Sequence, residues 1–187
     1  MEALLASLLV LMSVIFAMQI AVVTPQAPGT ASSTVEDQLG GVADGVLEAA
    51  AANETLRPTL LYWNVTAGGF HGVDGDYYVS TAPPTAFGEL LERSFDDRAI
   101  AYNVHVHYAS TDGGIESRTL VSYGTPSDDA VRAVHTVTLY DDDSLYRVDG
   151  TPSNETLANA SSFYVPNVSP ERPVYNVVRV EVVVWRR

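Results

Sequence analysis

The chain has 187 residues, and its 23 acidic side chains outnumber its 10 basic side chains, which gives a formal net charge of −13. Every basic residue is an arginine, and the chain contains neither lysine nor cysteine. Proteins that bind nucleic acid neutralise phosphates with clustered lysine and arginine, so the composition excludes nucleic acid as a partner. The lack of cysteine excludes disulfides, cysteine-based zinc sites and thiol nucleophiles.

The first element is an apolar segment, residues 3–23, which contains no charged side chain. A helix of this length spans about 31 Å, the thickness of the hydrocarbon core of a bilayer. We therefore expect residues 1–24 to form a transmembrane anchor that contacts membrane lipid. A cleaved secretory signal is the alternative, but its apolar region is usually shorter and follows basic residues, whereas Glu2 precedes this segment.

Residues 25–57 are predicted to form a linker and a partly amphipathic helix. Pro25 and Pro28 end the first helix. A capping box begins at Ser33, and apolar residues then recur at helical spacing, which predicts a helix over about residues 34–52. Three glycines in this helix each weaken it by about 1 kcal/mol relative to alanine, so it needs a surface on which to pack.

Residues 58–187 are predicted to form a β-rich domain outside the membrane. A short helix is expected after Pro84, and residues 141–173 are expected to form a surface loop because they contain turn residues and prolines. The expected fold class is α+β, in which a transmembrane helix and a second helix precede an antiparallel sheet. The predicted strands are two short apolar segments, 59–66 and 77–79, and four longer segments with alternating residues, 100–108, 115–123, 131–140 and 174–185.

Five of the seven asparagines stand in the acceptor sequence for N-glycosylation, which is asparagine followed two residues later by serine or threonine. Asparagine, serine and threonine also occur together in turns, which is the alternative explanation for the crowded stretch of residues 153–169. Glycosylation of any of these sites implies that the large domain faces outward. The candidate sites are Asn53, Asn64, Asn154, Asn159 and Asn167.

No pattern in the sequence identifies catalysis, and we predict no catalytic residue, cofactor or metal site. His105 and His107 lie on the same face of one predicted strand and offer two metal ligands, but no third ligand is placed by sequence alone. Two polar residues on the solvent side of a strand are the simpler interpretation. The acidic stretches at residues 74–76 and 141–143 lack the ligand spacing of an EF-hand, so acidic turns are favoured over calcium sites.

The order of elements, and the N-terminal sequence Met-Glu-Ala-Leu-Leu before a long apolar helix, resemble type IV pilins and pilin-like subunits. The chain is especially similar to the single-anchor, pilin-like proteins of salt-loving archaea. In that family a glutamate near the start of the mature helix pairs with the amino terminus of a neighbouring subunit, and Glu2 matches this position. The basic leader and peptidase site of the family do not precede Glu2 here, so we expect either that the true start of the protein lies farther upstream or that Glu2 is a residue at the membrane interface.

A second feature of the apolar segment favours assembly. Ser13, Ala17 and Ala21 recur every four residues, and such a stripe of small residues permits close approach of helices in lipid. Alanine is also common in any membrane helix, which is the alternative interpretation. Glu2, Ser13, Ala17 and Ala21 are therefore our candidate assembly residues, and their expected partners are other pilin-like subunits or envelope proteins.

Three functions remain open at this point. The first is a membrane-anchored pilin-like subunit, or minor component, of a type IV pilus-like surface or secretion apparatus. The second is a monomeric anchored domain that binds a ligand or partner of the cell envelope, and the third is an extracytoplasmic enzyme. In the first two the protein is a single-pass membrane protein with its C-terminal domain outside, and the acidic surface suits concentrated salt, in which its self-repulsion is screened.

Overall fold

The computed structural model describes residues 30–95 and 99–187, and the exposure of their side chains from residue 36 onward. The chain divides into two compact units, residues 1–34 and residues 35–187. All strands of the described residues belong to the second unit. The predicted membrane anchor lies outside the described residues.

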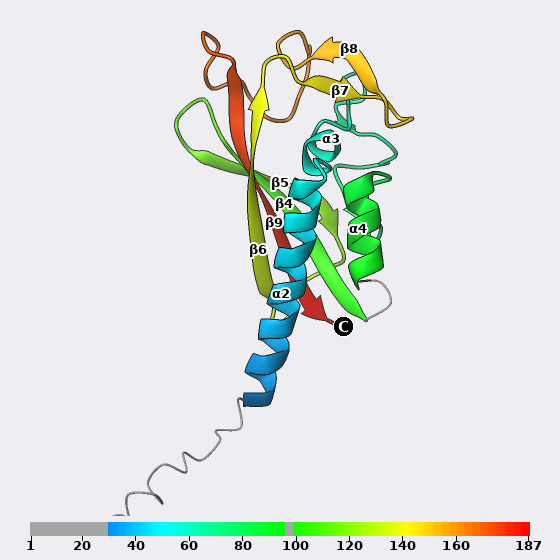
Figure 1. Ribbon diagram of the computed structural model, residues 1–187. Coiled ribbons are helices and arrows are strands. Elements are labelled where there is room, and N and C mark those ends of the chain that lie inside the picture. The colour runs from blue at the N-terminus through cyan, green and yellow to red at the C-terminus, as the bar shows by residue number, and fades with distance from the viewer. Residues whose placement is uncertain (1–29, 96–98) are drawn as a thin grey trace, which may run out of the picture. The chain divides into compact units, whose positions relative to one another are not determined.

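Figure 1 shows how helices and strands follow one another in the described part of the chain. The four longer strands expected from alternation are confirmed as β4, β5, β6 and β9, and the short helix expected after Pro84 is confirmed as α4. The helices are α2 (Thr30–Ala52), α3 (Leu56–Leu60) and α4 (Ala86–Phe95). The strands are β1 (Trp63–Asn64), β2 (Gly69–Phe70), β3 (Tyr78–Val79), β4 (Ile100–Ala109), β5 (Ile115–Ser122), β6 (Val131–Tyr140), β7 (Ser144–Tyr146), β8 (Pro152–Thr156) and β9 (Val174–Arg186).

The main sheet has five strands in the order β3-β5-β4-β9-β6. Strand β4 pairs antiparallel with β5 and β9, and β6 pairs antiparallel with β9. The short strand β3 runs parallel to β5, so the sheet is mixed where only antiparallel strands were expected. Its two edges also differ greatly, because β3 has two residues and β6 has ten. The fold is thus of the expected α+β class.

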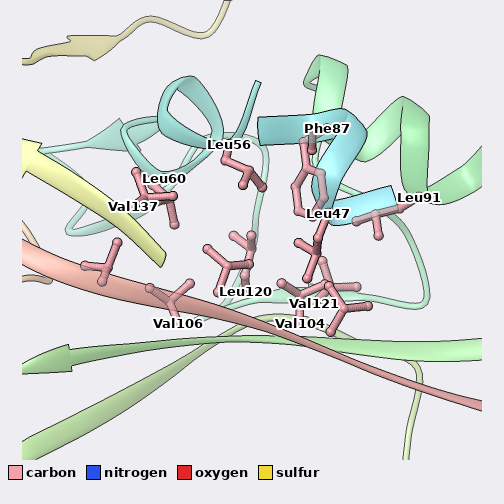
Figure 2. Close-up of a cluster of buried hydrophobic side chains, with 14 of the residues drawn as sticks. Leu47, Leu56, Leu60, Phe87, Leu91, Val104, Val106, Leu120, Val121 and Val137 are labelled. Atoms are coloured by element: carbon pink, nitrogen blue, oxygen red, sulfur yellow. The ribbon is translucent and has the colours of Figure 1, made fainter. Parts of the chain in front are cut away.

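Helix α2 packs on the sheet through one apolar stripe. The buried residues of this stripe recur at helical spacing, which confirms the amphipathic helix, although the helix begins at Thr30 rather than near residue 34. Figure 2 shows Leu47 of α2 and Phe87 of α4 above Val104 and Val106 of β4, so that two helices and the sheet share one core. The stripe of α2 is Leu39, Ala43, Val46, Leu47 and Ala50.

Helix α4 lies against the segment that precedes it. The Thr85 hydroxyl accepts a hydrogen bond from the backbone N–H of Gly88 at 3.3 Å, which caps the first turn. Gly88 is buried, and a Cβ atom at this position would lie 1.8 Å from the carbonyl oxygen of Pro83. The close approach of α4 to Pro83 therefore requires a glycine.

The side of the sheet that faces away from the helices is called the open face here. Along β4, Val104 and Val106 point toward the helices and are buried, whereas His105 and His107 alternate with them and are only half-buried. At one end of the open face a small buried cluster of Ala101, Val183 and Trp185 packs against Tyr123 and Ala130. The rest of the open face is formed by Val79, Asn103, His105, His107, Ala109, Ile115, Ser117, Thr119, Ser122, Arg132, Val134, Thr136, Thr138, Val177, Arg179 and Glu181.

The end of this unit farthest from the C-terminus is closed by the cap, which we define as residues 53–73 and 141–173 (Figure 1). The two segments are far apart in the sequence but are held together by hydrogen bonds. These run from Tyr146 N to Leu61 O (2.9 Å), from Trp63 Nε1 to Ser162 O (3.0 Å) and from the Tyr164 hydroxyl to Leu60 O (3.2 Å).

Two expectations for the cap are wrong. The segment 59–66 is not the expected strand, because Leu56–Leu60 is the helix α3 and only Trp63–Asn64 is a strand. Pro58 is tolerated because it lies in the first turn, where a missing N–H costs no helical hydrogen bond. Residues 141–173 are not merely a surface loop, because they contain the hairpin β7–β8 and bury four apolar side chains. These are Leu145, Leu157, Tyr164 and Val165.

Candidate functional site

The five asparagines of the acceptor sequences all lie in the cap, although they span more than a hundred positions of the sequence. Asn53 follows α2 and Asn64 ends β1, while the other three belong to β8 and the loop after it. Pairing between the two segments of the cap brings these sites to one end of the domain (Figure 1). The sheet faces and the opposite end carry none of these five asparagines.

The five sites differ in how accessible their side-chain amides are. Asn53, Asn154 and Asn159 are exposed, whereas Asn64 and Asn167 are half-buried. The Nδ2 atom of Asn167, to which a glycan would be attached, donates a hydrogen bond to Asp141 Oδ1 at 3.0 Å. A glycan on Asn167 would share Nδ2 with this hydrogen bond, whereas no hydrogen bond to a described residue involves the side-chain amide of Asn154.

The four candidate assembly residues, Glu2, Ser13, Ala17 and Ala21, lie outside the described residues. Within the described ranges, no helix is long and apolar enough to cross a membrane.

His105 and His107 lie side by side on the open face, as predicted, with ring centroids 6.4 Å apart. The Nε2 atom of His107 is buried and lies 3.2 Å from Glu181 Oε2 on β9, at ion-pair distance but without hydrogen-bond geometry. Arg132 Nε lies 3.3 Å from the other oxygen of the same carboxylate. Thr119 Oγ1 lies 3.3 Å from His105 Nδ1.

The protonation of His105 is governed by its surroundings. Burial lowers its pKa from the ordinary value of 6.5, the nearby Glu181 opposes this shift, and His107 and Arg132 add to it. The described residues contain no group of three or more histidine, cysteine or acidic side chains placed to hold a metal ion. Thr119, Glu181 and Arg132 provide the polar surroundings of the two histidines.

The acidic stretch at residues 141–143 supports the chain locally. Asp143 Oδ2 accepts a hydrogen bond from the backbone N–H of Tyr140 at 2.8 Å, which closes the turn between β6 and β7. Arg57 Nη1 lies 3.6 Å from Asp143 Oδ1, and its guanidinium lies 5.6 Å from the centre of the Tyr140 ring. Burial raises the pKa of Asp143, and Arg57 partly opposes this shift.

A cavity of about 550 Å³ opens between the cap and the edge strand β6. Its wall includes His135, Asp142 and the pair formed by Arg57 and Asp143. The wall therefore offers polar and charged groups to which a ligand could bind.

Arg118 of β5 contacts the aromatic core of the cap, and the sequence pattern did not single it out. Its guanidinium lies over the Trp63 ring at 4.9 Å from the centroid, and 5.8–5.9 Å from the Tyr164 and Phe70 rings. Its Nε atom is buried without a hydrogen-bond partner among the described residues, and one Nη atom lies 3.7 Å from Asp76. The three aromatic rings around Arg118 come from distant parts of the sequence, so no local sequence pattern predicts this contact.

Comparison with curated proteins and with solved structures finds no match to this chain. The model of DUF7288, a family of unknown function, matches residues 1–184. Because that match covers nearly the whole chain, the protein belongs to the DUF7288 family.

Proposed function

We propose that the protein is a membrane-anchored, pilin-like subunit, or a minor component, of a type IV pilus-like surface or secretion apparatus. The observation that carries the proposal is the packing of α2, which lays its apolar stripe on a mainly antiparallel sheet. In the sequence, α2 is preceded by 21 residues without a charge. This order of an apolar segment, a sheet-packed helix and an antiparallel sheet supports a pilin-like organisation.

The proposed anchor assigns the assembly contacts to Glu2, Ser13, Ala17 and Ala21. The stripe of small residues lets the backbones of neighbouring helices approach closely, and Glu2 would pair with the amino terminus of the next subunit. The partners are membrane lipid and other pilin-like subunits. The protein acts through contacts rather than through catalysis.

The orientation of the proposal is that residues 58–187 face outward, on the cell surface. The position of the candidate glycosylation sites supports this orientation, because all five lie in the cap and leave the sheet free of glycan. The net charge of the whole chain is −13, and concentrated salt screens the repulsion among its acidic side chains, so the domain stays soluble there.

The cavity of about 550 Å³ beside β6 favours one alternative, a monomeric anchored domain that binds a small polar ligand of the envelope. Arg57 and Asp143 in its wall are suited to a ligand with both a negative and a positive group. The two functions differ in whether the anchor helix contacts other copies.

Photo-crosslinking in native membranes tests the pilin-like proposal. A photoreactive amino acid replaces Ala17 in one variant and Ile15 in the control, which the helical repeat places on the far side of the helix from the small-residue stripe. We expect Ala17 to form crosslinks to a second pilin-like chain and Ile15 to label lipid. Labelling of lipid alone at both positions would contradict the proposal and favour the monomeric alternative.

Deletion of the gene gives a second, independent test. Electron microscopy of cells with and without the gene is expected to show a loss or shortening of surface filaments, which the intact gene restores and a variant with Ala17→Leu does not. Unchanged filaments and unchanged adhesion in the deletion strain would contradict the proposal.

A further inference from the structure

The open face differs in charge from the rest of this acidic protein. Its charged side chains are Arg132 and Arg179 against a single acid, Glu181, so its formal charge is positive in a chain of net charge −13. The Arg132 side chain is 71% exposed although it contacts Glu181. Arg179 is exposed and forms no ion pair with a described residue.

The open face also exposes apolar and short side chains between these arginines. Val134 of β6 is 53% exposed and Val177 of β9 is 49% exposed. Thr136 and Thr138 follow Val134 on the same face of β6, and Thr138 lies opposite Val177. No described helix covers this side of the sheet. A flat surface of valine and threonine flanked by arginines is suited to an acidic, rod-shaped partner.

Helix α2, on the other side of the same domain, has an acidic and rod-shaped outer surface. From residue 36 to its end, α2 carries four acids and no basic residue. Asp37, Asp44 and Glu48 are all exposed, and their spacing places them on one outward stripe, opposite the buried apolar stripe. The outer surface of α2 is therefore an acidic rod.

The spacing of the two surfaces also agrees. Arg132 lies opposite Val183, which is four residues from Arg179 along β9, so the two arginines are about 14 Å apart. On α2, Asp44 lies about 10 Å and Glu48 about 17 Å along the axis from Asp37. The separation of the two arginines lies between the two separations of the acids, and the difference of about 3–4 Å is within the reach of long arginine side chains.

We propose that the open face of one copy binds the acidic stripe of α2 of a second copy. Because the two surfaces lie on opposite sides of one domain, the contact is head-to-tail: a bound pair keeps one free open face and one free α2 stripe, so further copies add in series. This contact between the outer domains extends the proposed pilin-like function. It rests on that function only because it requires several copies in one membrane.

Salt acts on this contact in two ways. Two copies with net charge −13 repel each other at long range, and salt near 1 M shortens the range of that repulsion to about 3 Å. The arginine–carboxylate pairs in direct contact are screened less than the long-range repulsion. The contact should therefore be tested in membranes held near 1 M salt.

Cysteine crosslinking in membranes tests which surfaces meet, because the chain has no cysteine of its own. One full-length copy carries Val134→Cys on the open face, and a second copy with a different tag carries Gly41→Cys, an exposed position on α2 with no described atom within 4 Å of a new Cβ. A short bismaleimide is added to membranes that contain both copies. The control pair replaces Gly41→Cys with Val148→Cys, which is 69% exposed in the cap.

We expect crosslinked dimers that carry both tags from the first pair, and few from the control pair or from copies with Val134→Cys alone. Dimers formed by Val134→Cys with itself would overturn the proposal, because the open faces would then meet each other. Failure of Val134→Cys to link to any second copy would also overturn it, and would mean that another occupant, or none, covers the open face.

Charge reversal then tests the chemistry of the contact. Arg132→Glu with Arg179→Glu, in the copy with Val134→Cys, is expected to reduce the two-tag dimer about tenfold, which corresponds to about 1.4 kcal/mol. Asp37→Arg with Asp44→Arg in the other copy is expected to restore it. Restoration also shows that both variants are folded, and reversal of two cap arginines, Arg147→Glu with Arg172→Glu, is the charge-matched control.

The two proposals fail separately. If Val134→Cys on the open face forms crosslinks and Ala17 does not, assembly through the anchor helix is contradicted and the contact of the open face is supported. If Ala17 forms crosslinks but the first cysteine pair and the control pair give equal dimer yields, the contact of the open face is contradicted and the pilin-like function is supported. Unchanged yield after charge reversal would overturn the electrostatic basis of the contact.

Discussion

At the scale of single residues, Arg118 connects the sheet to the cap. It extends from β5 among the rings of Trp63, Phe70 and Tyr164. A partly desolvated guanidinium over aromatic rings contributes up to about 2 kcal/mol. Asp76 adds little, because its side chain is 88% exposed.

We expect Arg118→Lys to lower the free energy of unfolding by about 1–2 kcal/mol, because an ammonium group cannot stack its plane on the rings. Urea denaturation of the detergent-solubilised protein measures the change. The matched control is Arg147→Lys in the exposed turn of β7–β8, which should change stability by less than about 0.5 kcal/mol. Equal effects of the two substitutions would contradict the role of Arg118.

His105 is expected to make the domain less stable in mild acid. Its pKa is lowered in the folded state, mainly by burial, so below pH 6.5 the unfolded chain binds a proton that the folded chain resists. The stability associated with neutral His105 is present above pH 6.5 and is lost as the pH falls through the lower folded-state pKa. Denaturation midpoints between pH 7 and pH 5 should therefore fall less in His105→Gln than in the natural chain, and parallel curves would contradict this expectation.

At the scale of elements, the two helices on the sheet use glycine in opposite ways. Gly88 of α4 has no room for a Cβ, because Pro83 O would lie 1.8 Å away, whereas Gly45 of α2 has no described atom within 4 Å of the same position. We expect Gly88→Ala to destabilise the domain by about 1–3 kcal/mol through overpacking. Gly45→Ala should stabilise it by up to about 1 kcal/mol through higher helix propensity.

Thermal unfolding followed by circular dichroism measures both changes in the same protein. Because the substitutions are chemically identical, each is the control for the other. A loss of stability in Gly45→Ala would mean that α2 has an unrecognised contact at this point, and no loss in Gly88→Ala would mean that α4 can move away from Pro83.

The elements that could be predicted from sequence are those with many regular repeats. Strands β4, β6 and β9 have ten or more residues each, so the alternation of apolar and polar residues in the sequence extends over several repeats. The short strand expected at residues 77–79 is confirmed as β3, although two residues are too few to show a period. Strand β1 and the hairpin β7–β8 are also too short to show a period, and their form depends on contacts with distant residues. The parallel pairing of β3 with β5 is a purely tertiary feature.

The same limit applies to the candidate sites. The acceptor asparagines are visible in the sequence because the motif is local, and the shared face of His105 and His107 follows from alternation. The gathering of the asparagines in one cap, and the enclosure of Arg118 by three rings, depend on the pairing of residues 53–73 with residues 141–173. No local pattern contains that pairing.

At the scale of the whole molecule, glycan should be concentrated at one end. Asn154 is exposed and its side-chain amide has no hydrogen-bond partner among the described residues, whereas Asn167 is half-buried and its Nδ2 atom donates a hydrogen bond to Asp141. In protein from the native host, we expect occupancy to be highest at Asn154, followed by Asn53 and Asn159, and lowest at Asn167. Mass spectrometry of peptides measures this order.

Thr156→Ala removes the acceptor sequence of Asn154 and is expected to lower the mass of the protein by one glycan, while Thr138→Ala on the open face should leave it unchanged. A bare protein from the native host would contradict the outward orientation. Equal occupancy at Asn154 and Asn167 would contradict only the order of accessibility.

The ten-residue edge strand β6 has a practical consequence for production of the protein. Its outer edge is rich in valine and threonine, and Arg132 is its only formally charged residue, so it has few of the features by which natural edges resist templated growth. In a foreign cytoplasm, newly made chains are expected to add to this strand and deposit as inclusion bodies. A lysine in place of Thr138 should interrupt that deposition and raise the recovered yield.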